Sequence, residues 1–591
     1  MNVDRKRRLR ALALGALAAA ALFAPASTAG AAAWWRLPVW GAEVRAFALD
    51  PFETGVLYCG TSRGNFYVST DSGSTWEPLK AGPAFAGYYV TALAADPAVA
   101  GRLWASLAGE LGGGLVVSSD DRGASWTVLL KADKVVPTRA LALARGEPRL
   151  LAVGGDDGVR LSADGGRTWK RTGEGLEGLG QVESLAFDPA DRRVLYAGTW
   201  RQAFRTRDGG ATWSRIADGM VLDATVYAWD FDGADTRDVW VSTCGWVYHS
   251  KDGGDRWTRY TTGFTNRRSH SVKRDPTRPG VVYAATVGGL HRSDDGGATW
   301  ARISRESLVV TALEIDPRSG RLYVGTEGEG VFTSDDGGRT LESGSRGLPE
   351  ARVAEVVADP NDPGRVYFFR AFAGEESGVW EANGRQVRKV SRGALPATAS
   401  LASFRGPDGR TVLLVASSAG VRVSRDAGVH WDGPSAAPEG TAIVAYGAPF
   451  EVPVVVTTEG VFTTSDGKRF TAVPGGLRAV QAAELLADRN GDPLLEIRSG
   501  SALAYWDGRN WSTRKKAALG GGIFIQASND KPSGGYTNLQ DVGGTLLWQE
   551  GRSRRAFTSP RAALMLASAA EGAGGRVYVG TMGDGLFLFE P

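Results

Sequence analysis

Cysteine and histidine are scarce in this chain of 591 residues, which contains two of the former and four of the latter. Cys59 and Cys244 lie far apart in the sequence, so we expect two unpaired, half-buried thiols and no disulfide framework. The histidines are dispersed, and none stands with a cysteine at the spacing of a zinc site: they are His249, His270, His291 and His430. The sequence therefore predicts neither a metal site nor a cofactor.

Long apolar runs are absent beyond the first residues. The chain opens with basic "MNVDRKRRLR", apolar "ALALGALAAAALFA" and small-residue "PASTAGAAA", which are the three parts of a signal peptide. We expect residues 1–31 to be removed on export to the periplasm or beyond, with the Sec and Tat routes both open. No later stretch reaches the roughly 18 apolar residues of a membrane span. The mature chain is therefore expected not to be transmembrane.

An excess of positive charge is also lacking once the leader is removed. The whole chain has a formal net charge of +3, from 68 basic and 65 acidic side chains. Residues 1–31 contain five basic side chains and one acid, which leaves 63 basic against 64 acidic side chains. A net charge near zero gives no reason to expect nucleic acid as a partner.

What the sequence does contain is a repeated box, exemplified by "SADGGRTW" from Ser162 to Trp169. A motif that recurs this often belongs to the architecture rather than to one active site. Its third residue falls at Asp71, Asp121, Asp164, Asp208, Asp252, Asp295, Asp336, Asp426 and Asp466. The usual spacing of about 40–45 residues is that of propeller blades with four strands each.

The stretches between boxes have the pattern of short strands. In Val310–Thr340, "VTALEID" alternates and ends at Asp-Pro, "RLYVGT" is short and rich in β-formers, and "GVFTS" follows a glycine-rich turn. The box is then the turn between the third and fourth strands. Its Asp accepts bonds from backbone N–H groups, its Gly supplies conformational freedom, and its Trp packs between blades.

These boxes resemble the Asp-box (bacterial neuraminidase repeat) family, whose motif is S/T-x-D-x-G-x-x-W. Seven copies keep Asp, Gly and Trp, Leu341 replaces Trp in another, and "TSDGKRF" is a shortened ninth. The resemblance covers nearly the whole mature chain and fades after about residue 475. Proteins of this kind include sialidases, sortilin-type receptors, twin-propeller xyloglucan hydrolases and photosystem II assembly factors, so the resemblance implies a scaffold and leaves the activity open.

The expected fold class is all-β, with tandem β-propellers built from about thirteen four-stranded antiparallel blades, seven plus six or seven. Domain boundaries are expected at residues 1–31 for the signal peptide, 32–347 for a seven-bladed propeller and 348–591 for a degenerate one. "WWRLPVW" has a fourth-strand pattern without a blade before it, and the last repeat lacks its fourth strand. We therefore expect the two termini to complete one blade. One large ring of the sortilin type is the alternative.

Some residues also fit enzymatic roles. Arg36 stands in an Arg-x-Pro setting like that of sialidases, although Trp35 and Leu37 fit a fourth strand. A xyloglucanase would need two carboxylates in a cleft, whereas "CGTSRGN" stands where that family has "RTDVGG". Solvated loop acids are the preferred interpretation of the available carboxylates, which are Glu110, Asp156, Asp157, Glu327, Glu329, Glu375 and Glu376. No catalytic residue is predicted.

The remaining candidates lie on the loops between second and third strands and on the connections between blades. If the blades stack in order, these loops share one rim, opposite the Asp boxes. Exposed Trp and Arg are typical of binding hot spots, although some of the aromatics could instead pack against neighbouring blades. The expected ligand- or partner-binding residues are Arg63, Trp200, Arg201, Trp246, Arg267 and Arg268.

The sequence thus favours an exported, non-enzymatic propeller that binds a protein partner or an acidic or carbohydrate ligand. The resemblance to photosystem II assembly factors supports this hypothesis. The alternative is a carbohydrate-active enzyme or lectin of the sialidase or xyloglucanase sort. A deep pocket with two acids would favour the enzyme, and a broad rim of aromatic and cationic side chains would favour the binding scaffold.

Overall fold

The structure is a computed structural model. It describes residues 33–590 except for residues 80–84, 86, 133–137, 147–148, 173–180, 222–223, 234, 371–376, 393–394, 396–397, 418–419, 433–441, 447–452, 488–492, 514–522, 527–536, 543–544, 551–552, 559–565, 572 and 582–583. The expected signal peptide, residues 1–31, lies outside the described residues. The described part is built of β-strands, with one short helical turn, η4 (Ala573–Gly575). None of its helices is long and apolar enough to cross a membrane.

The first half of the chain forms seven four-stranded antiparallel sheets, each ordered as its strands occur in the sequence. These blades are β2 (Val44–Leu49), β3 (Leu57–Thr61), β4 (Phe66–Ser69) and β5 (Glu77–Pro78); β6 (Tyr88–Ala95), β7 (Leu103–Gly109), β8 (Gly114–Ser119) and β9 (Thr127–Ala132); β10 (Thr138–Leu143), β11 (Leu151–Gly155), β12 (Gly158–Ser162) and β13 (Lys170–Thr172); β14 (Val182–Phe187), β15 (Leu195–Thr199), β16 (Ala203–Thr206) and β17 (Ser214–Arg215); β18 (Val226–Phe231), β19 (Val239–Thr243), β20 (Trp246–Ser250) and β21 (Thr258–Tyr260); β22 (Ser269–Arg274), β23 (Val282–Thr286), β24 (Gly289–Ser293) and β25 (Ala301–Arg302); and β26 (Val310–Ile315), β27 (Leu322–Thr326), β28 (Val331–Ser334) and β29 (Glu342–Ser343).

The first strands of these seven blades contact one another in a closed cycle, because β26 contacts β2 as well as β22. The apolar clusters follow the same cycle. One cluster joins Phe47 and Cys59 of the first blade to Ala312 and Tyr323 of the seventh. The first half of the chain is therefore a seven-bladed propeller.

The second half continues with less regular blades, one of which has three strands. They are β30 (Val353–Ala358), β31 (Arg365–Arg370), β32 (Gly378–Asn383) and β33 (Gln386–Lys389); β34 (Thr398–Arg405), β35 (Thr411–Ser417) and β36 (Gly420–Ser424); β37 (Ala442–Tyr446), β38 (Val454–Thr457), β39 (Gly460–Thr463) and β40 (Thr471–Ala472); β41 (Ala482–Ala487), β42 (Pro493–Ser499), β43 (Ala502–Trp506) and β44 (Trp511–Ser512); β45 (Ile523–Gln526), β46 (Thr537–Val542), β47 (Thr545–Glu550) and β48 (Ser553–Thr558); and β49 (Leu566–Glu571), β50 (Val577–Thr581) and β51 (Leu586–Glu590), completed by β1 (Ala33–Arg36).

The fourth strand of this last blade comes from the N-terminus. Trp34 and Trp35 of β1 pair with Phe589 and Leu588 of β51 in an antiparallel ladder. β45 and β49 pair in parallel, which fuses the last two blades into one eight-stranded sheet. β30 contacts both β34 and β49, so the second set of blades also returns to its beginning. Together the two halves form tandem β-propellers.

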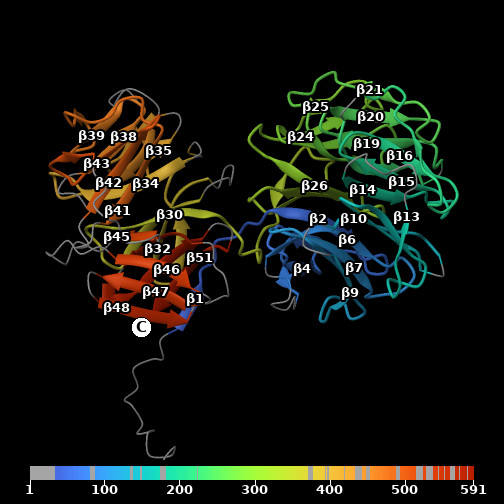
Figure 1. Cartoon of the computed structure of the whole chain (residues 1–591), viewed down its shortest axis with the longest axis horizontal. Helices are drawn as coiled ribbons and strands as arrows, with labels where there is room; N and C mark the ends of the chain where they lie inside the picture. The colour runs from blue at the N-terminus through green and yellow to red at the C-terminus, as the bar shows by residue number, and fades with distance from the viewer. Residues whose placement is uncertain are drawn as a thin grey trace, which may run out of the picture.

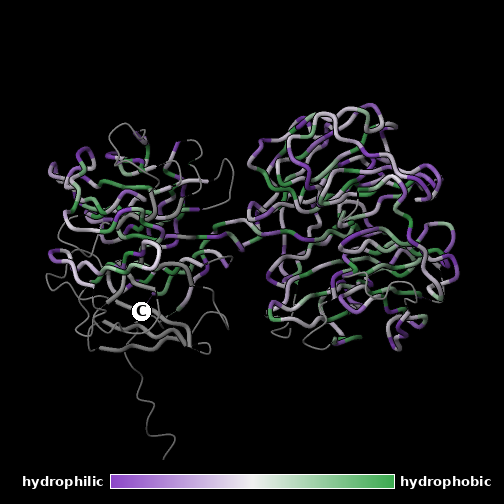
Figure 2. Tube along the Cα trace, turned by 45° about the horizontal axis from the view of Figure 1, so that its top comes forward, coloured by the Kyte–Doolittle hydropathy of each residue, from purple (hydrophilic) through white to green (hydrophobic). Residues whose placement is uncertain are grey.

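The two propellers lie side by side, with the blue N-terminal β1 placed beside β51 in the C-terminal body (Figure 1). The chain consequently crosses between the bodies twice, and the tube trace shows both crossings (Figure 2). Gly41 and Pro349 form a parallel bridge where the two crossing segments meet. We propose that the boundary between the two propellers falls here, near Ser345–Glu350.

Each Asp box is a turn closed by side-chain hydrogen bonds. In "SADGGRTW" the Ser162 hydroxyl donates to Asp164 at 2.8 Å and accepts from the Gly166 N–H at 2.7 Å. Asp164 accepts in addition from the N–H and the hydroxyl of Thr168, at 2.9 and 2.6 Å. The same hydroxyl-to-carboxylate bond is present in all nine boxes. The Asp therefore organises the turn that joins the third and fourth strands.

Two of the box tryptophans donate a hydrogen bond to the neighbouring blade. Trp257 of the fifth blade is buried, and its indole N–H donates at 2.7 Å to the carbonyl of Ile216, which follows the fourth blade. Trp76 of the first blade makes the same bond, also at 2.7 Å, to Gly344 at the end of the seventh. These residues therefore close the ring as well as packing its blades.

Truncation of a box tryptophan should destabilise the first propeller. We expect Trp257→Ala to lower the free energy of unfolding by about 3–5 kcal/mol, because a buried indole is lost and a cavity remains. Urea denaturation checks this, with Trp200→Ala as the control, because Trp200 is 53% exposed. A Trp257→Ala protein as stable as the control would contradict the packing role.

The box carboxylates should make stability depend on pH. Hydrogen bonds from Thr168 and Ser162 lower the pKa of Asp164 to about 2. Since this folded-state pKa lies below the unfolded value, the stabilisation is full above pH 4 and is lost as the pH falls towards 2. In melting-temperature measurements, Asp164→Asn should reduce stability at neutral pH and flatten the decline between pH 4 and 2. Glu77→Gln, which removes an exposed carboxylate outside the boxes, serves as the control. It should change neither the melting temperature at neutral pH nor its decline between pH 4 and 2.

Candidate ligand-binding site

A cavity of about 660 Å³ opens between the fourth, fifth and sixth blades. It lies at the rim formed by the loops between second and third strands and by the connections between blades. The Asp-box turns belong to the opposite rim, because successive turns of an antiparallel meander alternate between its two ends. The residues that line the cavity are Trp200, Val221, Ala224, Thr225, Tyr227, Cys244, Gly245, Trp246, Arg259, Asn266, Arg267, Arg268 and Val287.

Trp200 is presented by a loop fixed through its backbone. It follows β15, and its N–H donates to the Gln181 carbonyl at 2.8 Å. Its own carbonyl accepts a bond of 2.7 Å from the Thr225 hydroxyl, which comes from the next blade. The side chain remains 53% exposed. A large apolar surface is thus held in place while it faces solvent.

Trp246 and the two arginines are also tied together through the backbone. The N–H of Trp246, the first residue of β20, donates at 2.6 Å to the carbonyl of Arg267. Arg267 and Arg268 lie just before β22, and both are exposed. The N–H of Arg268 donates to the Asn266 side chain at 3.0 Å. This network sets the positions of the aromatic and cationic side chains of the cavity.

The cavity is cationic. Its described lining includes Arg259, Arg267 and Arg268 but no carboxylate. Burial raises the pKa of Tyr227, so its phenol stays protonated. Behind it, the ring of His270 stacks on Tyr227 with centroids 5.9 Å apart. Burial, together with the charges of Arg45 and Arg268, lowers the pKa of His270 to about 4. The imidazole is therefore neutral at physiological pH, and the arginines carry the charge.

The structure brings four of the six predicted binding residues together: Trp200, Trp246, Arg267 and Arg268. Arg201 follows Trp200 in the same loop, but it is not among the lining residues. Arg63 lies elsewhere, on the first blade, with its guanidinium 3.7 Å from Asp584 of the second propeller and 3.9 Å from Glu110.

Several lining residues were not predicted. Tyr227 belongs to a first strand, β18, where the pairing register shifts between Val226 and Ala228, and its side chain is only half-buried. Arg259 lies on the short fourth strand β21, where the sequence gives no signal of function. Val221 is 50% exposed in the connection between the fourth and fifth blades. These residues add apolar and cationic surface to the cavity.

The loop carboxylates considered for catalysis are engaged with arginines. Asp156 accepts from Arg139 at 2.9 Å and Asp157 from Arg160 at 2.9 Å. The remaining described pairs are Glu110 with Arg63, Glu327 with Arg352, and Glu329 with Arg305. The expectation of solvated acids is wrong for Glu329, which is only 6% exposed because it pairs with Arg305 at the base of its loop. Glu375 and Glu376 lie outside the described residues.

Arg36 has a structural position. It ends β1, where its guanidinium lies over the ring of Phe587 at 5.3 Å and donates to the Asp584 carbonyl at 3.1 Å. These contacts bind the N-terminal strand to the last blade. They give Arg36 a structural role and do not support the sialidase-like interpretation.

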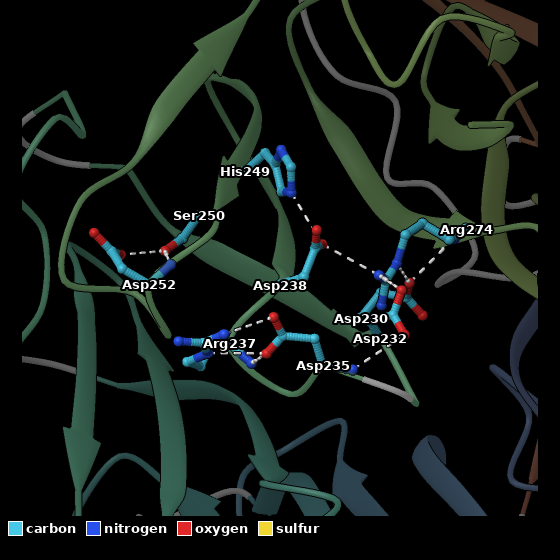
Figure 3. Close-up of polar contacts among 9 residues, drawn as sticks. All are labelled: Asp230, Asp232, Asp235, Arg237, Asp238, His249, Ser250, Asp252 and Arg274. Carbon is cyan, nitrogen blue, oxygen red and sulfur yellow. Dashed lines mark hydrogen bonds and ion pairs between the residues drawn. The ribbon is translucent and has the colours of Figure 1, made fainter. Parts of the chain in front are cut away.

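The histidines do not gather into a metal site. His249 lies at the Asp-box end of the fifth blade, where it contacts Asp238 at 2.9 Å (Figure 3). Arg274 bridges Asp238 to Asp230 and Asp232, at 3.1, 3.1 and 2.8 Å. Burial would raise the pKa of Asp238, but the bond from His249 and the nearby positive charges lower it. Each acid is thus paired with a base, and the described residues contain no cluster able to hold a metal ion.

The two cysteines form no disulfide. Cys59 is buried in the core between the first and seventh blades, and its burial raises its pKa well above the usual value. Cys244 lines the cavity, where its sulfur accepts from the Thr225 N–H at 3.3 Å.

Comparison with protein-family models and with curated proteins finds no match. Among solved structures, the chain is similar to a GH74 enzyme from Niastella koreensis, at 17% identity and a TM-score of 0.51, covering 94% of this chain and 99% of that one. The GH74 xyloglucanase from Xanthomonas campestris is similar at 17% identity and a TM-score of 0.52, covering 95% of this chain and 100% of that one. An ancestral GH74 enzyme is similar at 14% identity and a TM-score of 0.62, covering 95% of this chain and 99% of that one. These likenesses support the tandem-propeller fold.

Proposed function

We propose that this protein is an exported, non-enzymatic propeller that binds an acidic segment of a protein partner at the cavity between the fourth, fifth and sixth blades. The observation that carries the proposal is the lining of that cavity, with three arginines, two tryptophans and no carboxylate among the described residues. Trp and Arg are the side chains most often found at the energetic centres of interfaces. Arginine also binds carboxylates with two parallel hydrogen bonds.

The accessibility of these groups supports the same proposal. Arg267 and Arg268 are exposed, and Trp200 presents half of its surface to solvent. Their backbones are held by bonds to the neighbouring blades, so little ordering is required when a ligand binds. A regular scaffold that carries variable loops is where binding residues concentrate in many folds.

Charge reversal at this rim should abolish capture of the partner. The variant Arg201→Glu, Arg267→Glu, Arg268→Glu should weaken binding by about 100-fold or more, because charge-assisted bonds are replaced by repulsion. The same complex should dissociate in salt, since the screening length falls from about 10 Å at 0.1 M to about 3 Å at 1 M. Capture from envelope extracts, followed by mass spectrometry and titration of the identified partner, measures both effects.

A matched control reverses three arginines on the opposite rim: Arg193, Arg207 and Arg237, whose side chains are 64–73% exposed. Their surface ion pairs contribute little to stability. The control variant should retain the partner. Retention of the same partner by the Arg201, Arg267 and Arg268 variant would show that the binding site lies elsewhere.

A second candidate function is glycoside hydrolysis. The similarity of 94–95% of the chain to GH74 enzymes, one of them named a xyloglucanase, favours this candidate. The pairing of the described candidate carboxylates Glu110, Asp156, Asp157, Glu327 and Glu329 with arginines favours the binding protein instead, because a glycosidase needs one carboxyl group as acid and another as nucleophile or base. We expect no reducing ends to be released from xyloglucan. Release that disappears in Glu327→Gln would establish the hydrolase.

A further inference from the structure

Trp246 has a backbone conformation that other blades give to glycine. It is the first residue of the third strand, opposite Thr243 in a tight hairpin, and its φ is +90°. The corresponding first residues of β12, β24 and β36 are Gly158, Gly289 and Gly420, with φ of +101°, +110° and +95°. Among the described residues other than glycine, Trp246 has the largest positive φ. A bulky side chain at such a position is strained.

The strained tryptophan lies outside the apolar clusters that join its blade to the fourth and sixth blades. Its side chain is only half-buried, and the aromatic contact it makes is a tilted one with Phe264, at 6.2 Å between ring centroids. The bond from its N–H to the Arg267 carbonyl is a backbone bond, which a glycine would make equally well. What the indole adds is a wall of the cavity. Strain of this kind is typical of functional positions.

The cavity has an apolar part and a cationic part. Trp200 and Val221, 53% and 50% exposed, provide apolar surface together with Trp246. Arg267 and Arg268 provide the charge on the adjoining loop. A ligand that uses both parts carries an anion next to a planar apolar group. In a peptide, this chemistry is an aromatic side chain flanked by Asp or Glu.

Building on the proposed function, we infer that Trp246 is the residue that selects the ligand, and that the cavity takes a peptide segment in which an aromatic residue is flanked by acidic residues. The aromatic ring packs on Trp246, while the flanking carboxylates bind Arg267 and Arg268. Aromatic pairs add affinity beyond the area that they bury. The strain at Trp246 is then retained because the indole is needed at that point of the rim.

Two peptides test this inference on the full mature protein: acetyl-Glu-Glu-Phe-Glu-Glu-amide and the same peptide with Ala in place of Phe. By calorimetric titration, the wild type should bind the Phe peptide about tenfold more tightly, which corresponds to about 1.4 kcal/mol. Trp246→Gly should bind both peptides with the affinity that the wild type has for the Ala peptide. Phe52→Ala, which removes a ring that is 49% exposed on the opposite rim, should behave as the wild type.

Melting temperatures separate this role from a structural one. Trp246→Gly relieves the positive φ whereas Trp246→Ala does not, so the Gly variant should melt about 2–4 °C above the Ala variant. The Gly variant should also melt no lower than the wild type. A Gly variant that still discriminates between the peptides would overturn the inference, and one that also melts well below the wild type would make Trp246 a packing residue.

The remaining outcomes are distinct. A wild type that binds both peptides equally would overturn the role of Trp246 but leave the cationic site standing. A wild type that binds neither peptide would overturn the proposed function together with the inference. Binding of oligogalacturonate that depends on Trp246, without binding of either peptide, would replace the peptide by an acidic carbohydrate.

Discussion

A blade of this protein has two apolar faces, and only neighbouring blades can cover them. The second strands are buried over their whole length; β3, β15 and β27 are examples. Each blade therefore depends on the next, and the series must return to its start before the last face is covered. In the first propeller, this closure is the contact between the first and seventh blades, where Trp76 donates to Gly344. The closed ring of blades and its two rims follow from that cyclic requirement.

Closure of the second propeller has a further consequence. Because its last blade takes the N-terminal strand, the chain crosses between the two bodies twice, and the two segments are bridged at Gly41 and Pro349. Next to this bridge, the carboxyl group of Glu350 is almost fully buried and accepts bonds from the Tyr67 hydroxyl at 2.8 Å and from the Asn65 amide. Burial raises the pKa of Glu350. The double crossing and this network tie the second propeller to the first blade.

The sequence predicts the blades well because each carries its own local signal. Nine boxes mark the turns between third and fourth strands, Asp-Pro marks many of the turns between first and second strands, and glycines mark many of the hairpins between second and third strands. The number of blades and the pattern of the terminal strand could be inferred for the same reason. The parallel pairing of β45 with β49 could not, since it fuses two blades that have no box and depends on their approach in space.

The site was predictable only in part. Trp200, Trp246, Arg267 and Arg268 come from consecutive blades, so a repeat that stacks in order brings them together. Arg63 occupies the same kind of loop, but its partner Asp584 lies at the other end of the chain, and no local pattern indicates that contact. The positive φ of Trp246 could not be predicted from the sequence either. "CGW" becomes unusual only when its third residue is aligned with Gly158 and Gly289 of other blades.

The two rims of the first propeller have different roles: the Asp-box rim stabilises the blades, and the opposite rim carries the proposed binding residues. At the Asp-box rim, each box carboxylate accepts hydrogen bonds within its own turn. Asp164, for example, accepts three such bonds. Changes there cost stability, so that rim has little freedom to vary. The opposite rim holds its loops through bonds to the backbone of the binding residues, such as those from the Thr225 hydroxyl to the Trp200 carbonyl and from the Trp246 N–H to the Arg267 carbonyl. Side chains at these positions can change while the loops keep their places, which is how a strained tryptophan and adjacent arginines can be carried on an otherwise regular ring.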